Sequence, residues 1–522
     1  MLQFQKYVYQ MSVFRSYCRC VSLPSRGEQV MTTVKPATRI DRTYARCYSN
    51  GTGSSLLKDE LKFLQSFYAS ETHGVLSIES GCRRFCELYR SMDAGSKMEL
   101  LRHIAENYGV DQTVIVNVAQ RVIDIQTRGD VPMLRAEERL KRALTAKYQL
   151  LFTDIGRLEG GVKFLADMRA DILWLLSKSA TSVSETDRAH LTSLQLCLKE
   201  LLSLWFTMGF LRLERLTWQS PCDVLQKISE FEAVHPVRHW ADLKRRVGPY
   251  RRCFVFTHTS MPREPIVVLH TALTGEISSS IDSILERPGG RDNADTRVPE
   301  HGHEDPNKIN TAMFYSVTST QKGLHGVDLG NYLIKRAAGE LAREWPQITQ
   351  FSSISPIPGF REWLLGEINR QIAALKDGSR EGSAHLLTLE EVESICSISN
   401  TSNDILLALL HVKELINDHI WTKSPQTSQT LKPLLMRLCS QYLYKAKRRG
   451  YALNSVANFH LQNGAVLWRL NWAADMTSRG LENSCGLMAN YRYFLNDTVT
   501  NSQRYIESGY ICASEQVLLL CG

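Results

Sequence analysis

The chain has 522 residues, of which 43% are hydrophobic and 22% are charged, and its formal net charge is +8. This length exceeds what one hydrophobic core usually serves, so at least two domains are expected. No apolar run approaches the roughly 18 residues that span a bilayer, which argues against membrane insertion. The positive charge is concentrated in residues 1–50, which contain eight basic and two acidic residues, so the main argument for a nucleic-acid-binding protein is removed.

Residues 1–50 have the composition of a targeting segment. No acidic residue precedes Glu28, and arginines alternate with aromatic and hydroxyl residues. A secretory signal would need an apolar segment of roughly 7 to 15 residues, which is missing. The segment is therefore predicted to be a mitochondrial transit peptide, with a disordered tail as the alternative. Translation from Met31 would remove most of it and give a cytosolic form.

The cysteines indicate neither a zinc site nor a disulfide scaffold. There are 13, and they form no C-x-x-C pair. Buried thiols in a reducing compartment are the simpler interpretation.

The segment 56–206 is predicted to be an all-helical domain, because its apolar residues recur every three to four positions. One stripe runs from Leu134 through Leu140 and Leu144 to Phe152, and a second runs from Leu191 to Trp205. Such stripes are typical of a core or a helix interface, so no catalytic role is assigned to them.

The pattern changes at Gly209, and residues 207–522 are predicted to form a second domain. Residues 210–216 alternate apolar and charged side chains, as a half-buried strand does. Two β-rich runs, 253–257 and 266–273, are joined by Met261-Pro-Arg-Glu-Pro265, which indicates a hairpin.

Residues 286–308 are polar and contain glycine and proline, which predicts a loop. His301 and His303 stand there beside Glu304 and Asp305 and resemble a metal cluster. Two histidines in a polar loop are more often solvated, so no metal site is predicted.

A strand, a glycine-rich loop and a helix follow one another between residues 311 and 344. Residues 311–318 read as the strand, residues 321–330 as the loop and residues 331–344 as an amphipathic helix. Glycines let the backbone approach a ligand, and the helix start offers N–H groups to a phosphate. The spacing matches neither common nucleotide motif, so an ordinary turn stays open as the alternative.

The remaining chain alternates between the two kinds of pattern. Residues 350–355 and 465–472 read as strands, whereas residues 387–444 read as helical. The second domain is therefore predicted to be α+β with a helical insertion.

Several long phrases in this domain resemble the malonyl-CoA decarboxylase family. Three of them are Phe351-Ser-Ser-Ile-Ser-Pro-Ile-Pro-Gly-Phe360, Val456-Ala-Asn-Phe-His-Leu-Gln-Asn-Gly-Ala465 and Cys485-Gly-Leu-Met-Ala-Asn-Tyr-Arg-Tyr-Phe494. The resemblance covers residues 56–518. It implies an N-terminal helical domain involved in oligomerisation and an acetyltransferase-like α/β catalytic domain.

The resemblance also implies the site residues. It assigns Ser355 and His460 as the catalytic pair, and Tyr493 as a weaker candidate for hydrogen bonding in the pocket. The coenzyme A diphosphate is expected on the loop that comprises His325, Gly326, Val327, Asp328, Leu329, Gly330 and Asn331.

The implied chemistry is loss of carbon dioxide from malonyl-CoA to give acetyl-CoA through a thioester enolate. This route needs donors for the developing oxyanion and an acid for the carbanion, but neither a metal nor an organic cofactor. His460 is expected to donate the proton, since its reference pKa of about 6.5 suits that step. Ser355 is expected to orient the carboxylate that leaves.

The resemblance implies a homo-oligomer, with a tetramer built as a dimer of dimers as the expectation. The family counterpart of Cys222 is associated with a redox-linked contact between subunits. The basic segment from Lys244 to Arg252 could meet coenzyme A phosphates or another subunit, with a solvated basic face as the default.

The mitochondrial matrix is the expected location. Peroxisomal targeting is in doubt because the chain ends Leu518-Leu-Leu-Cys-Gly522 instead of Ser-Lys-Leu.

Two other functions remain open at this point. One is an acyl-CoA N-acyltransferase that uses the same loop, and the other is a non-enzymatic acyl-CoA-binding scaffold. A serine thioesterase is disfavoured because no G-x-S-x-G motif is present.

Overall fold

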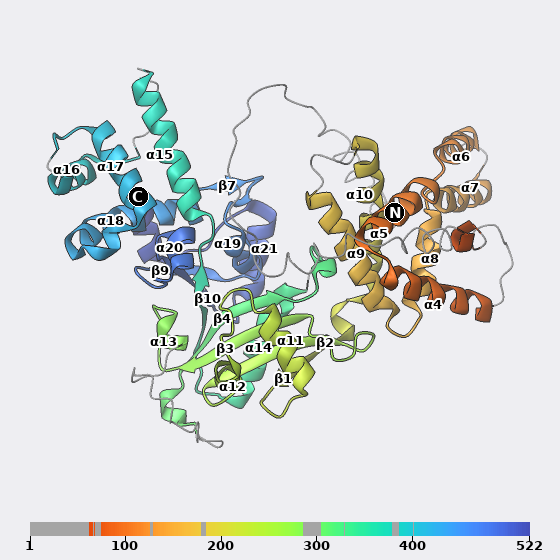
Figure 1. Cartoon of the computed structure of the whole chain (residues 1–522), viewed down its shortest axis with the longest axis horizontal. Helices are drawn as coiled ribbons and strands as arrows, with labels where there is room; N and C mark the ends of the chain where they lie inside the picture. Colours follow the sequence, from red (N-terminus) through yellow and green to blue (C-terminus); the bar gives the residue numbers. More distant parts are fainter. Residues whose placement is uncertain are drawn as a thin grey trace.

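The computed structural model describes residues 62–65, 67, 75–125, 129–178, 184–285, 304–327, 329–377, 386–399 and 401–522. The predicted transit peptide lies outside these residues. The described chain combines a helical domain at the N-terminal end with a mixed domain of helices and sheet (Figure 1).

The N-terminal domain is helical, as its apolar periodicity predicts. Its helices are α4 (Val75–Ser91), α5 (Ala94–Asn107), α6 (Gln112–Ile125), α7 (Asp130–Ala143), α8 (Lys147–Gly156), α9 (Gly161–Lys178) and α10 (Glu185–Trp205). The stripe from Leu191 to Leu201 is buried in the domain core, together with Phe152. The oxygen of the Ser184 side chain accepts a hydrogen bond from the Asp187 amide and so caps α10.

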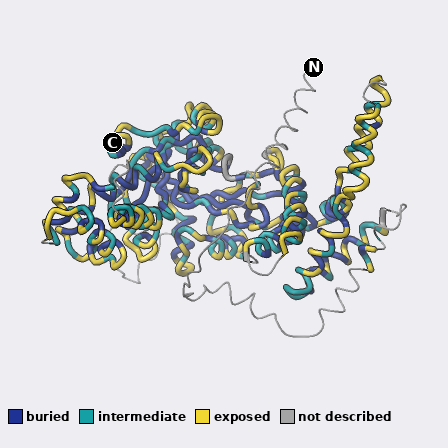
Figure 2. Tube along the Cα trace, turned by 90° about the horizontal axis from the view of Figure 1, so that it is seen from above, coloured by how far each residue is buried: buried dark blue, intermediate teal, exposed yellow. Residues whose placement is uncertain are grey.

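The first apolar stripe is only partly core. Tyr148, Leu151 and Phe152 are buried, whereas Leu134 and Leu144 are 63% and 55% exposed. These two leucines belong to α7 and its C-terminal cap, in a part of the domain that projects from the rest (Figure 2). The prediction that this stripe is buried in a core is therefore correct for α8. It is wrong for α7, where these two leucines are not covered by other parts of the same chain.

A single eight-stranded sheet organises the second domain. Its strands are β1 (Leu211–Leu216), β2 (Arg251–His258), β3 (Val267–Thr274), β4 (Thr311–Ser319), β5 (Gln350–Ser353), β6 (Ser355–Pro356), β9 (Val466–Asn471) and β10 (Met488–Tyr493). Strands β1 to β4 are antiparallel neighbours, and β4 runs parallel to β5. Strand β10 pairs with β5 and β6 and also with β9. The predicted strands and the β2–β3 hairpin are confirmed.

Helices cover both faces of strands β1 to β4. On one face, α14 (Gly330–Glu344) packs its leucine and alanine side chains against Phe254, Phe256 and Leu269. On the other face, α11 (Cys222–Phe231) and α12 (Trp240–Arg246) pack against Cys253 and Val255. Because side chains alternate along a strand, these two sets point to opposite sides.

The helical insertion begins earlier than predicted. It comprises α15 (Phe360–Lys376), α16 (Leu389–Ser399), α17 (Ile405–Asp418) and α18 (Pro425–Tyr444), and α15 was not predicted. The remaining helices are α13 (Asp282–Leu285), α19 (Ser455–Gln462), α20 (Ser478–Ser484), α21 (Thr498–Ser508) and α22 (Glu515–Cys521). A small sheet of β7 (Lys447–Arg448) and β8 (Tyr451–Ala452) precedes α19. Within the part of the chain that the structure describes, no helix is long and apolar enough to cross a membrane.

The predicted solvated basic face between Lys244 and Arg252 is wrong for two of its arginines. Arg246 is buried and forms an ion pair of 3.0 Å with Asp242. Arg252 is buried between Glu304 at 2.7 Å and Glu344 at 2.6 Å. Burying an arginine requires such partners. The pair of Arg252 and Glu344 also links β2 to the C-terminal end of α14.

Candidate active site

A cavity of about 340 Å³ opens where β4 and β5 separate. The parallel pairing of the two strands ends at Phe314 and Ser353, and the amide of Ile354 donates a last hydrogen bond of 3.1 Å to the Phe314 carbonyl. Beyond this point the neighbouring segment, β6, pairs only with β10. On this edge, the second half of β4 therefore faces the cavity, while its other edge stays paired with β3.

The lining of the cavity joins the two regions that the sequence singled out. The glycine-rich loop contributes His325, Gly326, Val327 and Leu329. Strand β6 and helix α19 contribute the other side, and their lining residues are Ser355, Pro356, Ser455, Val456, Phe459 and His460.

Ser355 and His460 are in direct contact. The Ser355 Oγ lies 2.8 Å from His460 Nε2, and the other ring nitrogen, Nδ1, lies 2.7 Å from the Tyr493 hydroxyl. All three residues are buried. The predicted pair is thus brought together across 105 positions of the chain.

Tyr493 lies behind the imidazole. Its hydroxyl is hydrogen-bonded to His460, and its ring packs edge-on against Phe314 with centroids 6.0 Å apart. The described residues that line the cavity do not include Tyr493. In this geometry the phenol forms a hydrogen bond to His460, and its contact with a substrate stays a prediction.

Short-range contacts fix the two catalytic candidates relative to each other. Asn454 caps α19 by accepting a hydrogen bond of 2.8 Å from the Ala457 amide. The Asn454 side-chain amide also donates to the Pro358 carbonyl at 2.8 Å. One side chain therefore joins the start of the helix that carries His460 to the segment that follows Ser355.

Two site residues were not predicted. The Ser353 Oγ lies 2.8 Å from the Ser355 Oγ, and the ring of Tyr491 stacks on His460 with centroids 4.4 Å apart and planes at 16°. Ser353 stands two positions before Ser355, and Tyr491 stands two positions before Tyr493 on β10. Since side chains two apart on a strand share a face, this spacing was the signal available in the sequence.

The electrostatic state of His460 differs from the expectation. Burial lowers its pKa to about 3, so the imidazole is neutral near pH 7. Burial also raises the pKa of the Tyr493 phenol well above its ordinary value, so this group keeps its proton. The near-neutral pKa expected from the sequence does not hold for the free site, because His460 is only 4% exposed and little solvent is left to stabilise its charged form.

Three buried histidines are expected to make the fold sensitive to acid. Burial lowers the pKa of His235 and His270 to about 4, although the Glu232 carboxylate opposes these two shifts, and that of His460 to about 3. At pH 5 the three rings are neutral when folded but protonated in the unfolded chain, whose histidine pKa is about 6.5. The unfolded state binds more protons, so stability decreases as pH falls from about 6.5 toward about 4, by up to about 1.4 kcal/mol per pH unit for each ring.

We therefore expect the thermal unfolding midpoint to decrease from pH 7 to pH 5. The decrease should be smaller in His460→Asn than in the wild type, because one titrating group is lost. Differential scanning calorimetry at both pH values measures this. An equal decrease in the two proteins would contradict the depressed pKa of His460.

The glycine-rich loop forms a compact turn before α14. It starts with a short 3-10 helix, η4 (Lys322–Leu324), and Gly326 has a φ of +77°, which favours glycine. Asp328 lies outside the described residues, as do the side chains of Asn331 and its neighbours at the start of α14.

No metal cluster is found among the described residues. His301 and His303 lie outside them. Glu304, which sequence placed beside these histidines, instead pairs with Arg252 at 2.7 Å.

Two family models together match the chain from residue 108 to residue 520. The model of the malonyl-CoA decarboxylase C-terminal domain matches residues 209–520, and that of the N-terminal domain matches residues 108–206. The chain belongs to the malonyl-CoA decarboxylase family. The predicted boundary between a helical and a mixed domain near residue 207 falls between the two matched segments.

Relatives and solved structures of the family agree with this assignment. Malonyl-CoA decarboxylase, mitochondrial, from Anser anser anser is 48% identical over 437 residues, which are 83% of this chain and 82% of the relative. The Mus musculus protein of the same name is 47% identical over 85% of both chains. The crystal structure of malonyl-CoA decarboxylase from Rhodopseudomonas palustris matches 90% of this chain and 99% of its own, with 27% identity and a TM-score of 0.69. That from Agrobacterium vitis matches the same shares with 26% identity and a TM-score of 0.70.

Proposed function

We propose that this protein decarboxylates malonyl-CoA to acetyl-CoA and carbon dioxide. The observation that carries the proposal is the hydrogen-bonded pair of Ser355 and His460 inside a cavity whose other side is a glycine-bearing loop that leads into a helix. The loop suits a diphosphate and the pair suits proton transfer. Relatives that are 47% to 48% identical carry the name of this activity.

We further propose that the second domain binds coenzyme A in the manner of the acetyltransferases. Support comes from the parallel β4 and β5, which separate after Phe314, and from α14, which starts directly after the loop. Beyond Phe314, the edge of β4 that β5 no longer pairs with leaves backbone groups for the amides of a pantetheine arm. The thioester then lies at the inner end of the cavity, beside Ser355.

The proposed reaction breaks the bond between C2 and the carboxyl carbon. The electron pair moves onto the thioester as an enolate, carbon dioxide leaves, and a proton adds to C2, so one proton is consumed in each turnover. Ser355 orients the carboxylate so that the breaking bond stands out of the thioester plane. His460 delivers the proton from Nε2. In the neutral ring Tyr493 donates to Nδ1, so the ring hydrogen stands on Nε2 and points toward Ser355; in the imidazolium, Nδ1 donates to the Tyr493 oxygen.

The source of the proton follows from the low pKa of His460 in the free site. A malonyl carboxylate placed beside the ring favours the imidazolium, because opposite charges stabilise each other strongly in a buried site. Substrate binding thus recruits the proton that the enolate later receives. Acetyl-CoA has no such carboxylate, so the product leaves a neutral ring behind.

One assay separates this proposal from its alternatives. Purified protein is incubated with malonyl-CoA, and acetyl-CoA and carbon dioxide are measured. Formation of both in equal amounts supports decarboxylation. An N-acyltransferase would require an added amine, and a binding scaffold would return malonyl-CoA unchanged; either result would refute the proposal.

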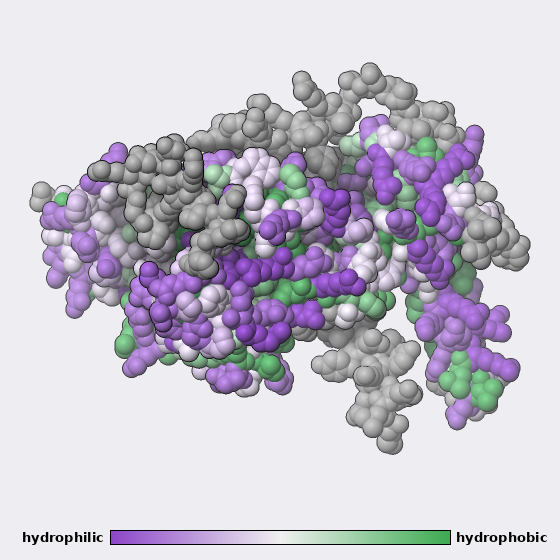
Figure 3. Space-filling view, turned by 90° about the horizontal axis from the view of Figure 1, so that it is seen from below, coloured by the Kyte–Doolittle hydropathy of each residue, from purple (hydrophilic) through white to green (hydrophobic). Residues whose placement is uncertain are grey.

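We propose that the helical domain mediates assembly into a homo-oligomer, with a tetramer as the expected state. Support comes from the α6–α7 hairpin, which projects from the domain and carries apolar side chains in solvent (Figures 2 and 3). None of the described residues of α6 is buried. The side chains concerned are Val114, Val116, Ile123, Val131 and Leu134, each at least 44% exposed. A second copy is the partner that would cover them.

We propose that Cys222 forms an oxidisable contact between subunits. It is exposed at the first turn of α11, whereas the other described cysteines are buried or half-buried. An exposed thiol can meet its symmetry mate across a twofold axis.

Under mild oxidation the wild type should therefore run as a covalent dimer on a non-reducing gel, and Cys222→Ser should run as a monomer. Cys512→Ser, which removes a half-buried thiol, is the matched control and should behave like the wild type. A monomer band for the oxidised wild type would exclude the bridge.

We propose that the protein acts in the mitochondrial matrix. Support comes from the basic composition of residues 1–50 and from the curated relatives, which are named mitochondrial. A reporter fused to residues 1–50 tests this, and a reporter that stays in the cytosol would refute it.

A further inference from the structure

The helical domain lies directly against the glycine-rich loop. Helices α9 and α10 form the side of that domain that faces the sheet (Figure 1). A side chain at Gly323 would place its Cβ 1.7 Å from the Ala166 carbonyl oxygen of α9, so only glycine allows this approach. The contact makes the position of the loop depend on the helical domain.

A buried arginine strengthens this contact. Arg169 of α9 donates a hydrogen bond to the Gly323 carbonyl. Its guanidinium also donates to the backbone and side-chain oxygens of Gln195 on α10, at 3.3 and 3.2 Å. Helices α9 and α10 and the loop are therefore fixed to one another by one side chain.

One turn further along α10, Lys199 reaches the next glycine of the loop. A Cβ atom placed on Gly326 would lie 3.4 Å from the Lys199 Nζ and 3.6 Å from its Cε. Gly326 lines the cavity, so the ammonium lies beside a residue of the cavity wall. Within the described part of the chain, no carboxylate lies at ion-pair distance from Lys199.

Three N–H groups of the described part of the loop are not free for an anion. The amides of His325, Val327 and Leu329 donate to carbonyls of the loop, at 3.1, 3.0 and 3.0 Å. A diphosphate in this place would need a further source of positive charge besides the start of α14. A lysine ammonium is a strong partner for phosphate oxygens.

We propose that Lys199 binds the diphosphate of coenzyme A, so that the helical domain completes the substrate site of the catalytic domain. This inference rests on the proposed function. The partner chemistry is a diphosphate rather than the thioester or the malonyl group, because Lys199 lies beside Gly326 of the loop, whereas Ser355 and His460 line the cavity from β6 and α19.

Three substrates test which group Lys199 binds. Malonyl-CoA has the diphosphate and the 3′-phosphate, malonyl-dephospho-CoA has only the diphosphate, and malonyl-pantetheine has neither. Lys199→Gln is expected to raise KM roughly tenfold for the first two and to leave KM for the third unchanged, with kcat nearly constant for all. Lys199→Arg, which keeps the charge, should stay within about threefold of the wild type.

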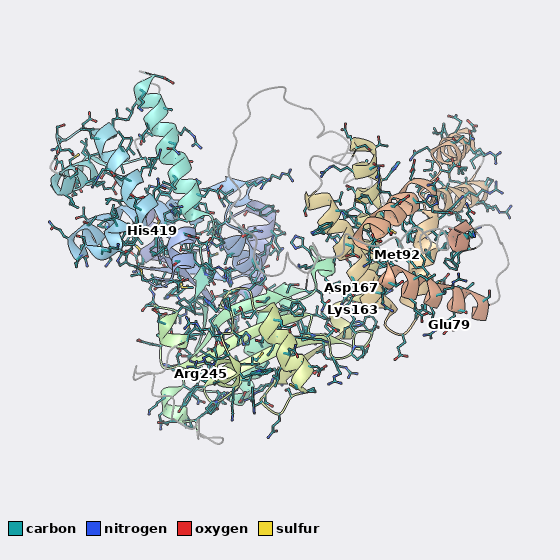
Figure 4. The ribbon with its side chains drawn as sticks, in the orientation of Figure 1. Glu79, Met92, Lys163, Asp167, Arg245 and His419 are labelled. Carbon is teal, nitrogen blue, oxygen red and sulfur yellow. The ribbon has the colours of Figure 1, made fainter. Side chains whose placement is uncertain are left out.

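Lys163→Gln is the matched control. Lys163 lies on α9 of the same domain, near its border with the sheet, but its ammonium is neutralised by Asp167 at 2.5 Å (Figure 4). This variant should keep the wild-type KM for every substrate.

Several results would overturn the proposal. One is an unchanged KM for malonyl-CoA in Lys199→Gln. Another is an equal rise for malonyl-pantetheine, which would indicate a structural defect, and a third is a rise confined to malonyl-CoA, which would place Lys199 at the 3′-phosphate. Calorimetric titration with coenzyme A alone keeps the test independent of turnover: a roughly tenfold weaker affinity in Lys199→Gln supports the proposal even if the wild type does not decarboxylate malonyl-CoA.

Discussion

Replacement of His460 by asparagine is expected to lower kcat by about 10² to 10⁴-fold, the usual effect of removing a positioned acid. Asparagine keeps a hydrogen-bonding group near Ser355, which lies 2.8 Å from the imidazole, but it cannot take up and release a proton. Affinity for coenzyme A should stay within about threefold of the wild type, because the loop that is proposed to bind the diphosphate forms another part of the cavity. Steady-state kinetics with malonyl-CoA and calorimetric titration with coenzyme A measure the two quantities.

A second histidine provides the control for this variant. His411 lies on α17, in the helical insertion, and does not line the cavity. His411→Asn should therefore keep the wild-type kcat. Turnover of His460→Asn near the wild-type value would show that another group protonates the enolate, even if the activity of the protein is as proposed.

The elements that carry the site follow from local sequence. The strand, loop and helix between residues 311 and 344 were predicted because apolar alternation, glycines and helical periodicity follow one another without interruption. The hairpin of β2 and β3 was predicted from the prolines that separate two β-rich runs. In each case the signal lies within some 35 residues, so no knowledge of distant contacts is needed.

Strand β10 shows where such local signals end. This strand lies between β5 and β9 and was not predicted. Its buried positions include the polar residue Asn490, which is completely inaccessible to solvent. This asparagine is satisfied by distant carbonyls, since its side-chain amide donates to Ser353 at 2.8 Å and to Ser278 at 3.1 Å. A polar residue in a strand reads as exposed when those partners are unknown. The same reason explains why Arg246 and Arg252 were expected in solvent.

The catalytic candidates were identified by resemblance rather than by their spacing. Ser355, His460 and Tyr493 come from β6, α19 and β10, and only the fold brings them together. Their chemistry also depends on the fold, since the low pKa of His460 arises from burial beneath Tyr491 and beside Phe459. A reference pKa is a property of the isolated side chain and could not have indicated this state.

Lys199 is a further residue that sequence could not single out. It is one of several lysines on the N-terminal helices. A role in substrate binding is inferred only because α10 brings Lys199 next to the loop of the other domain. For a decarboxylase of this family, the sequence resemblance had assigned oligomerisation to the helical domain. The contacts of Gly323 and Arg169 show that this domain also fixes the loop that is proposed to bind the substrate.

Replacement of Ser355 by alanine is expected to lower kcat roughly 10- to 100-fold, the loss that accompanies removal of one buried hydrogen-bonding group. The Ser355 hydroxyl has two neighbours, Ser353 Oγ and His460 Nε2, each at 2.8 Å, so the change removes both contacts together with the orienting group for the carboxylate. Ser353→Ala, which keeps the contact between Ser355 and His460, is the matched control and should lose less than tenfold.

The double variant Ser355→Ala/His460→Asn decides whether the two residues serve one step. If Ser355 orients the carboxylate whose departure creates the carbanion that His460 protonates, neither side chain retains its full effect once the other is lost. The double variant should then stay within about threefold of His460→Asn, far from the product of the two single losses. Both singles and the double are compared by single-turnover measurements, which separate chemistry from product release. Losses that multiply would show that Ser355 and His460 act independently, and the 2.8 Å contact between them would then be structural.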